Sequence, residues 1–189
     1  LSRLFAIVLG KEYRVDVRIT VSDNGFSLMP SKDKDVDIKK LVDIAINSNV
    51  REVLKDNIRR TELMKRRFRH CAARSFLILR NYKGHKISVR KQQVNAEKLI
   101  RICESIDPEF PIIEETYREI LEDLMDIKCA ENVLKDIKEK KIRYTVIETR
   151  VPSPFAHNLI VLGEADIVLM RDRRERLIEL HERILKEIA

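Results

Sequence analysis

The feature that most limits how this chain can fold is a strict alternation of apolar and polar residues in YRVDVRITV, residues 13–21. Alternation with a period of two is typical of a half-buried strand. Asn24-Gly25 follows, and both residues accept the positive φ of a tight hairpin turn. A second short apolar stretch after this turn predicts a return strand. The sequence therefore predicts a β-hairpin over residues 13–30.

Outside this hairpin, apolar residues mostly recur every three or four positions, which is the spacing of amphipathic helices. A further alternating stretch, IRYTVIETRV at 142–151, predicts a third strand that pairs with the hairpin. We therefore predict an α+β fold that is mostly helical with a small antiparallel β-sheet. We expect a single domain over residues 1–189, with a helical body at 36–140 and the strand and C-terminal helices at 142–188. The predicted helices cover residues 1–10 (ended by Gly10), 36–47, 50–83 (ended by Gly84), 89–106 (capped by Ser88 or Asn95), 113–124, 130–137 and 167–188.

The charge of the chain favours an anionic partner. Lys and Arg number 38 against 31 Asp and Glu, which gives a formal net charge of +7 and a pI near 9.4. A balance this basic favours nucleic acid first and an acidic membrane surface second. Charged residues make up 37% of the chain, against about a quarter in an ordinary globular domain.

Other features of the sequence bear on its cellular setting. No apolar run approaches the length of a membrane span, and LSRLFAIVLG lacks the basic start and cleavage site of a signal peptide. Cys71, Cys103 and Cys129 are far apart and odd in number, which fits reduced thiols. We expect a cytoplasmic protein with no membrane partner. Because the chain begins with Leu in mid-pattern, we also expect a fragment of a longer protein.

Basic and acidic residues are segregated along the chain. Between Arg59 and Lys91 there are twelve Lys or Arg and one acid, Glu62. Between Glu104 and Asp126 there are nine acids and one base. The basic segment 59–91 therefore needs negative charge to neutralise it, and the acidic segment 104–126 can supply such charge.

A helical wheel divides the basic segment RRFRHCAARSFLILRNYKG, residues 66–84, into two faces. Clustered cations on the exposed face repel one another, so a neutralising partner stabilises them. That partner is either external phosphate or the chain's own acidic helix at 114–126, and both alternatives stay open. The face predicted to be buried holds Met64, Phe68, Cys71, Ala72, Ser75, Leu79 and Tyr82, and the exposed face holds Arg66, Arg69, His70, Arg74 and Arg80.

The loop HKISVRKQQ after Gly84 adds to the case for an external anion. Ser88 can open a helix whose first turn carries Arg90 and Lys91. Free backbone N–H groups, the positive end of a helix and two cations together favour phosphate. Gln92 and its neighbour Gln93 can hydrogen-bond bases or backbone.

Motifs for independent catalysis are missing from the sequence. It has no GxxxxGK[ST] loop for nucleotide phosphates and no CxxC, HExxH or spaced Cys/His set for a metal. Ser153 and His157 lie four residues apart, without a third group or an oxyanion motif. Tryptophan is absent and aromatic residues make up 5% of the chain, so we expect no extended stacking platform for single strands.

Four segments resemble the large helicase-related (Lhr) family of superfamily 2 helicases. RRFRHCAARSFLILRNYKG with the following VRKQQ, and VPSPFAHNLI, look like signature segments of that family. SDNGF at 22–26 and EILEDLMDI at 119–127 are similar to its archaeal branch. The resemblance extends over nearly the whole chain, with the segments in the family's order.

The resemblance implies a role within a larger enzyme. In that family two RecA-like motor domains bind ATP, a winged helix follows, and a further DEAD/DEAH-helicase-associated domain clasps the tracked single strand. This chain resembles that last domain. The resemblance therefore implies a parent protein that uses ATP and Mg²⁺ in domains outside this chain, moves 3′ to 5′ on DNA, and serves in DNA repair or replication-fork maintenance.

The segment VPSPF predicts a rigid turn. Pro152 and Pro154 fix φ on either side of Ser153, which can then cap a short helix that begins at Pro154. We expect Phe155 to anchor this turn. A structural corner and a direct contact with the strand are both kept as interpretations.

These observations lead to one main hypothesis and two alternatives. The main hypothesis is a non-catalytic accessory domain that contacts the tracked strand, with single-stranded or tailed duplex DNA as partner and RNA left open. The first alternative is an interdomain scaffold that docks on the motor or winged-helix domains without touching nucleic acid. The second is an independent nuclease or glycosylase. The candidate strand contacts are Arg66, Arg67, Arg69, His70, Arg74, Arg80, Arg90, Lys91 and Gln92.

Overall fold

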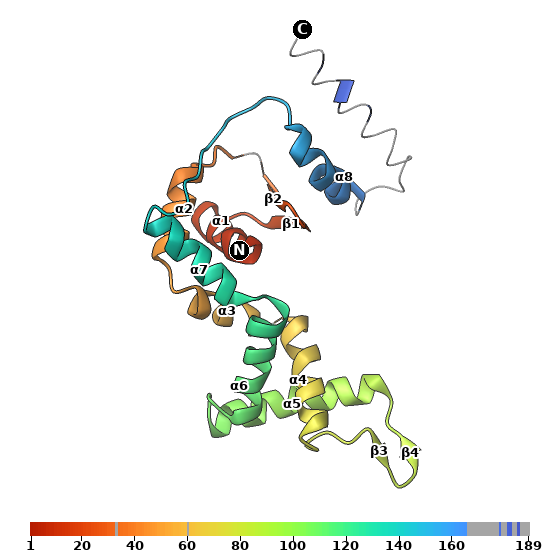
Figure 1. Cartoon of the computed structure of the whole chain (residues 1–189). Helices are drawn as coiled ribbons and strands as arrows, with labels where there is room; N and C mark the ends of the chain where they lie inside the picture. The colour runs from red at the N-terminus through yellow and green to blue at the C-terminus, as the bar shows by residue number, and fades with distance from the viewer. Residues whose placement is uncertain (33, 60, 166–177, 179–180, 183–184, 186–189) are drawn as a thin grey trace. The chain divides into compact units, whose positions relative to one another are not determined.

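The computed structural model in Figure 1 describes residues 1–32, 34–59, 61–165, 178, 181, 182 and 185. Of the helix predicted over 167–188, only positions 178, 181, 182 and 185 are among these residues, and the rest of that prediction lies outside them. Two compact units emerge, one of residues 1–48 with 136–189 and the other of residues 49–135. The prediction of a single domain over residues 1–189 stays a prediction. The α+β class is confirmed, because helices dominate and two small antiparallel sheets accompany them.

The predicted N-terminal hairpin is present in the first unit. Strand β1 (Val17–Ser22) pairs antiparallel with β2 (Gly25–Pro30), and Val21 lies opposite Phe26. The turn consists of Asp23 and Asn24, one residue earlier than predicted. Neither has a positive φ. The Asn-Gly signal therefore located the hairpin correctly but not the conformation of its turn.

Helix α1 (Ser2–Tyr13) continues through Gly10, where the sequence predicted its end. It ends instead at Arg14, whose φ of 53° is left-handed. Gly10 is required for a close approach, because the chain folds back and the Val15 N–H donates to the Gly10 carbonyl at 3.3 Å. A Cβ on Gly10 would lie 3.1 Å from the Val15 carbonyl oxygen.

Helices cover both faces of the hairpin. On one face the ring of Phe5 from α1 lies 5.9 Å from that of Phe26. On the other face α8 (His157–Ala165) packs against β1, and a Cβ on its Gly163 would lie 2.9 Å from Thr20 Oγ1. Successive strand residues point to opposite faces, so the hairpin lies between α1 and α8, with its strand residues half-buried or exposed. Helix α2 (Ile38–Asn47) packs against α1.

The third strand predicted at 142–151 was wrong. This segment links α7 (Ile127–Lys138) to a short 3₁₀ turn, η2 (Pro154–Ala156), and has no strand partner. Ile142 and Tyr144, which carried the alternation, are exposed. Alternation becomes a strand only where a neighbouring strand accepts its backbone hydrogen bonds. The hairpin instead packs against α1 and α8.

The second unit is a cluster of helices: α3 (Val50–Ile58), α4 (Glu62–Arg74), α5 (Val89–Ile106) and α6 (Pro111–Arg118), which leads into a π-helix, η1 (Glu119–Leu124). Helix α4 packs against α5 and α6, as Figure 1 shows, and α5 also packs against α6. Within α4 the core-facing residues are as predicted, since Met64, Phe68, Cys71 and Ala72 are buried.

The single helix predicted over 50–83 was wrong. Thr61 begins α4 anew by accepting a hydrogen bond from the Met64 N–H at 3.3 Å, and the helix ends at Ser75. A second hairpin follows, in which β3 (Asn81–Tyr82) pairs with β4 (His85–Lys86). Gly84 has the positive φ predicted for it, but it serves the hairpin turn and not a helix end. Leu79 and Tyr82, predicted to be buried, are therefore exposed.

Phe76, directly after the end of α4, combines an unfavourable backbone conformation with a free side chain. Its φ is 61° and the residue is 83% exposed. Left-handed conformation costs a residue with a Cβ about 1–2 kcal/mol. We expect Phe76→Gly to raise the free energy of unfolding by about 1 kcal/mol, measured by urea denaturation of the chain. Phe76→Ala keeps the Cβ and should bring no such gain. A loss of stability in Phe76→Gly would mean that the ring packs on the protein.

Candidate nucleic-acid interface

The arginines of α4 are divided between two directions. Arg67 and Arg74 are seven residues apart, close to two helical turns, so they share one face of the helix. Both reach the same carboxylate, that of Glu119 at the start of η1. Arg67 Nη1 lies 3.3 Å from Glu119 Oε2, and Arg74 Nη2 forms an ion pair with Glu119 Oε1. The Glu119 side chain is 7% exposed.

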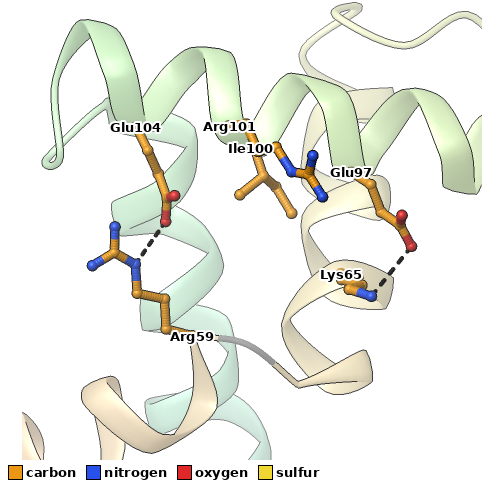
Figure 2. A pocket seen from close by; sticks show the side chains of 6 residues that line it. All are labelled: Arg59, Lys65, Glu97, Ile100, Arg101 and Glu104. Carbon is orange, nitrogen blue, oxygen red and sulfur yellow. Dashed lines mark hydrogen bonds and ion pairs between the residues drawn. The ribbon is translucent and has the colours of Figure 1, made fainter.

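Other basic residues of this unit also pair with the acidic segment. Arg51 lies 3.4 Å from Glu122 and Lys55 lies 3.3 Å from Glu114. Arg59 Nε donates to Glu104 at 2.9 Å, as Figure 2 shows. The internal pairing left open by the sequence thus occurs.

Figure 2 also shows why the hollow beside Arg59 is a poor anion site. On its other side Lys65 lies 3.3 Å from Glu97 of α5. The Arg101 side chain points into the space between the two ion pairs. Carboxylates therefore lie on both sides of this hollow of about 380 Å³.

Arg66, Arg69 and Arg90 lie together in a different place. They line an open groove of about 560 Å³ between α4 and the start of α5, which we call the α4–α5 groove. Within the described part of the chain, none of the three has an acidic partner within ion-pair distance. Glu62 also lines the groove, but Lys65 pairs with it at 2.8 Å. The remaining lining residues are Val89, Gln93 and Val94.

The start of α5 has the geometry predicted for it. Ser88 caps the helix, and its hydroxyl accepts a hydrogen bond from the Lys91 N–H at 3.3 Å. Arg90 and Lys91 are exposed in the first turn. Gln92 differs from its neighbours, because it is buried and its amide donates to the Ile87 carbonyl at 2.8 Å. Its side chain ties the preceding loop to the helix.

His70 lies among the cations of α4. Burial lowers its pKa first, and the positive charges of Arg69, Arg67, Arg80 and Arg74 lower it further. Arg69 Nη2 lies 3.4 Å from His70 Nε2. Burial and the neighbouring positive charges thus both disfavour the charged form of this imidazole. Arg80 is exposed in the loop after α4, not on the helix where the wheel placed it.

The VPSPF turn lies in the other unit. Ser153 precedes η2 as predicted, and its carbonyl accepts a hydrogen bond from the Ala156 N–H at 2.8 Å. Its side chain makes no capping hydrogen bond. Phe155 does not anchor the turn, since it is 93% exposed. The fixed φ of the two prolines and this backbone hydrogen bond hold the corner.

Sequence reasoning missed the apolar part of the groove and the exposed rings nearby. Val89 and Val94 line the groove and are exposed, although valines more often lie in a core. Phe76 and Tyr82 are exposed, because the helix ends earlier than its periodicity suggests. Lys83-Gly84 between two short polar stretches was the available signal for the second hairpin.

The family model described as "DEAD/H associated" matches residues 1–156. The chain belongs to this family. It is 47% identical over 192 residues to ATP-dependent helicase Lhr-Core protein 2 of Thermococcus barophilus, and 46% identical over 189 residues to ATP-dependent helicase Lhr-Core of Saccharolobus solfataricus. These alignments cover 100% and 98% of this chain but 22% of each relative, so the chain spans about a fifth of their length.

A solved structure also resembles the chain. This is Mycobacterium smegmatis helicase Lhr bound to ssDNA and AMP-PNP, with a TM-score of 0.62 and 27% identity. The match covers 84% of this chain and 20% of that one. The resemblance to Lhr helicases predicted from the sequence is therefore confirmed. No helix among the described residues is both long and apolar enough to cross a membrane.

The Glu119 carboxylate should be needed for stability. Glu119→Gln leaves Arg67 and Arg74 without their counter-charge, so we expect it to lower the free energy of unfolding by about 2 kcal/mol. Chemical denaturation of the chain measures this loss. Glu115→Gln is the matched control, because its partner Arg118 is exposed and such pairs contribute about 0–1 kcal/mol. Equal effects of the two substitutions would contradict the assignment.

The pKa of His70 should respond to its neighbours. Removing a cation in Arg69→Gln should raise that pKa toward its ordinary value, as an NMR titration of the imidazole can measure. Arg118→Gln, which does not act on His70, should leave it unchanged. Because its pKa is lowered, His70 binds fewer protons in the folded protein than in the unfolded chain. The contribution of His70 to the free energy of unfolding is therefore complete above the ordinary histidine pKa of about 6.5, and it falls as the pH drops below that value. An unchanged His70 pKa in Arg69→Gln would contradict this effect of the neighbouring positive charges.

Proposed function

We propose that this chain is the accessory domain of a longer ATP-dependent 3′–5′ DNA helicase of the Lhr type. In this proposal the chain holds the tracked single strand through its phosphates and catalyses no reaction itself. ATP and Mg²⁺ bind motor domains outside this chain, and the partners of the domain are single-stranded or tailed duplex DNA and the helicase's own RecA-like and winged-helix domains. Similarity to Lhr-Core helicases and to an Lhr helicase bound to ssDNA supports this role.

The observation that carries the proposal is the contrast between paired and unpaired arginines in one helix. Arg67 and Arg74 are neutralised by a buried carboxylate. Arg66 and Arg69 turn instead into the α4–α5 groove, where Arg90 joins them from a second helix. Three cations that converge on an open groove form a site for a phosphate backbone.

Each candidate residue then has a defined role. Arg66, Arg69 and Arg90 contact phosphates in the groove, and Lys91, Arg80 and His70 extend the positive surface around it. Arg67 and Arg74 hold α4 in place through Glu119. Gln92 positions the start of α5 through its hydrogen bond to Ile87. These contacts are sequence-independent, because phosphates are the same at every nucleotide.

An interdomain scaffold is the second candidate function, and one feature favours it. Apolar side chains from the loop after α4 and from α5 line a hollow of about 330 Å³ on this unit. Leu77, Leu79 and Ile102 in it are exposed. Exposed apolar side chains that gather in one place are typical of surfaces that other domains cover. Docking of this kind is compatible with strand binding in the groove.

The salt dependence of strand binding tests the groove. Each phosphate contact to a single strand contributes about 0.7 to the slope of log K against log salt concentration. In the longer helicase we expect Arg66→Ala, Arg69→Ala and Arg90→Ala together to flatten that slope by about 2. Fluorescence anisotropy with oligothymidylate over a range of salt concentrations measures the change.

The matched control removes three exposed cations that line none of the three hollows described above, Lys11, Lys39 and Arg143. It loses the same net charge and should leave the slope nearly unchanged. If the two triple variants have the same slope, the groove does not hold the strand. If neither differs from the wild type, the domain does not bind phosphate through these cations and the scaffold function is favoured.

A further inference from the structure

The β3–β4 hairpin is a small, well-defined projection of the second unit (Figure 1). Tyr82 lies opposite His85, and a two-residue turn joins the strands. The turn residues Lys83 and Gly84 have φ values of 49° and 79°, the left-handed conformation that matches the twist of a hairpin. At the base the Ile87 N–H donates to the Arg80 carbonyl at 2.8 Å. The sequence predicted a helix here, so this surface is new.

Aromatic rings and cations share the surface of this segment. Tyr82 is 57% exposed and Phe76 is 83% exposed. Arg80, Lys83, His85 and Lys86 are exposed beside them. No acidic residue occurs between Glu62 and Glu97. Centres of protein–protein interfaces are depleted in charge, whereas exposed rings interleaved with cations are typical of surfaces that bind single-stranded nucleic acid.

The arrangement of Tyr82 suits a base more than an apolar side chain. Lys83 Nζ lies 5.5 Å from the centre of the Tyr82 ring, so a positive charge is held beside the ring. A base stacked on such a ring brings its own phosphate near the ammonium group. The Phe76 ring is exposed and so packs little on the protein, although the residue has an unfavourable φ of 61°. Strained, exposed residues are concentrated at binding sites.

The hairpin is also tied to the start of the α4–α5 groove. Gln92 of α5 donates to the Ile87 carbonyl, directly after β4. Arg90 is the fourth residue after Lys86, so their Cα atoms are at most about 14 Å apart. Arg90 is itself a lining residue of the groove. A strand that leaves the groove at Arg90 is thus within reach of the hairpin.

From these observations we propose that the β3–β4 hairpin stacks a base of the single strand on Tyr82, with Phe76 as a second ring and Lys83 and Lys86 at the adjoining phosphates. This inference rests on the proposed function, because the groove brings the strand to the hairpin. It adds a contact of a different kind. Stacking needs a base, whereas the groove needs only phosphate.

An abasic strand separates the two kinds of contact. The experiment measures binding of the full-length protein that contains this chain to oligothymidylate and to an abasic strand of the same length. We expect Tyr82→Leu to weaken binding to oligothymidylate about tenfold and to leave binding to the abasic strand unchanged. Tyr82→Phe keeps the aromatic face and should bind as the wild type does. Tyr144→Leu removes an exposed tyrosine ring outside this unit and serves as the control.

Each other outcome has a defined meaning. If Tyr82→Leu binds both strands as the wild type does, while the Arg66, Arg69 and Arg90 triple variant binds both weakly, the stacking inference is overturned and the proposed function stands. If neither variant changes binding to either strand, both fail. If Tyr82→Leu leaves binding unchanged and lowers the melting temperature of the DNA-free protein, the ring packs on another part of the protein and the inference is overturned.

Discussion

The buried carboxylate of Glu119 is the interaction on which the arrangement of the second unit depends. It is the one buried acidic side chain in the part of the chain whose burial the structure describes. Two arginines of α4 converge on it, and it belongs to the first residue of a π-helix. A buried charge is tolerated only where it is paired, so the position of Glu119 fixes the rotation of α4 about its own axis.

The direction of the remaining arginines follows from that rotation. Residues three apart on a helix share a face, and the face that holds Arg66 and Arg69 is turned away from the one that holds Arg67 and Arg74. The start of helix α5 lies beside Arg66 and Arg69 of α4 and adds Arg90 to them. One internal carboxylate, with its two ion pairs, thereby determines which cations remain for an external anion. The proposed strand contact is a consequence of how α4 packs.

Local signals predicted much of this structure. Ser88 was one of the two caps predicted for α5, beside Asn95, and the buried residues of α4 itself were identified from helical spacing. Both depend on residues close together in the sequence. Arg66, Arg69 and Arg90 were likewise identified as candidates from charge alone. Their separation from Arg67 and Arg74 was not predicted, because Glu119 lies far along the chain and its position is set by tertiary packing.

The wrong predictions share a physical cause. The third strand at 142–151 had the right alternation, but this segment pairs with neither strand of the hairpin, on whose faces helices pack instead. The helix over 50–83 had the right spacing, but it ends at Ser75, where Phe76 adopts a left-handed conformation that its residue type does not announce. In both cases periodicity described a tendency of the segment, and contacts with distant residues decided its structure.

The central claim is that the arginines of α4 are divided between an internal carboxylate and an external strand. NMR of the arginine Nε–Hε groups in the ¹⁵N-labelled chain, titrated with a short oligothymidylate, tests this directly. The account predicts that the signals of Arg66, Arg69 and Arg90 shift with added strand, while those of Arg67 and Arg74 stay in place. Shifts of Arg67 and Arg74 as large as those of Arg66 and Arg69 would contradict it.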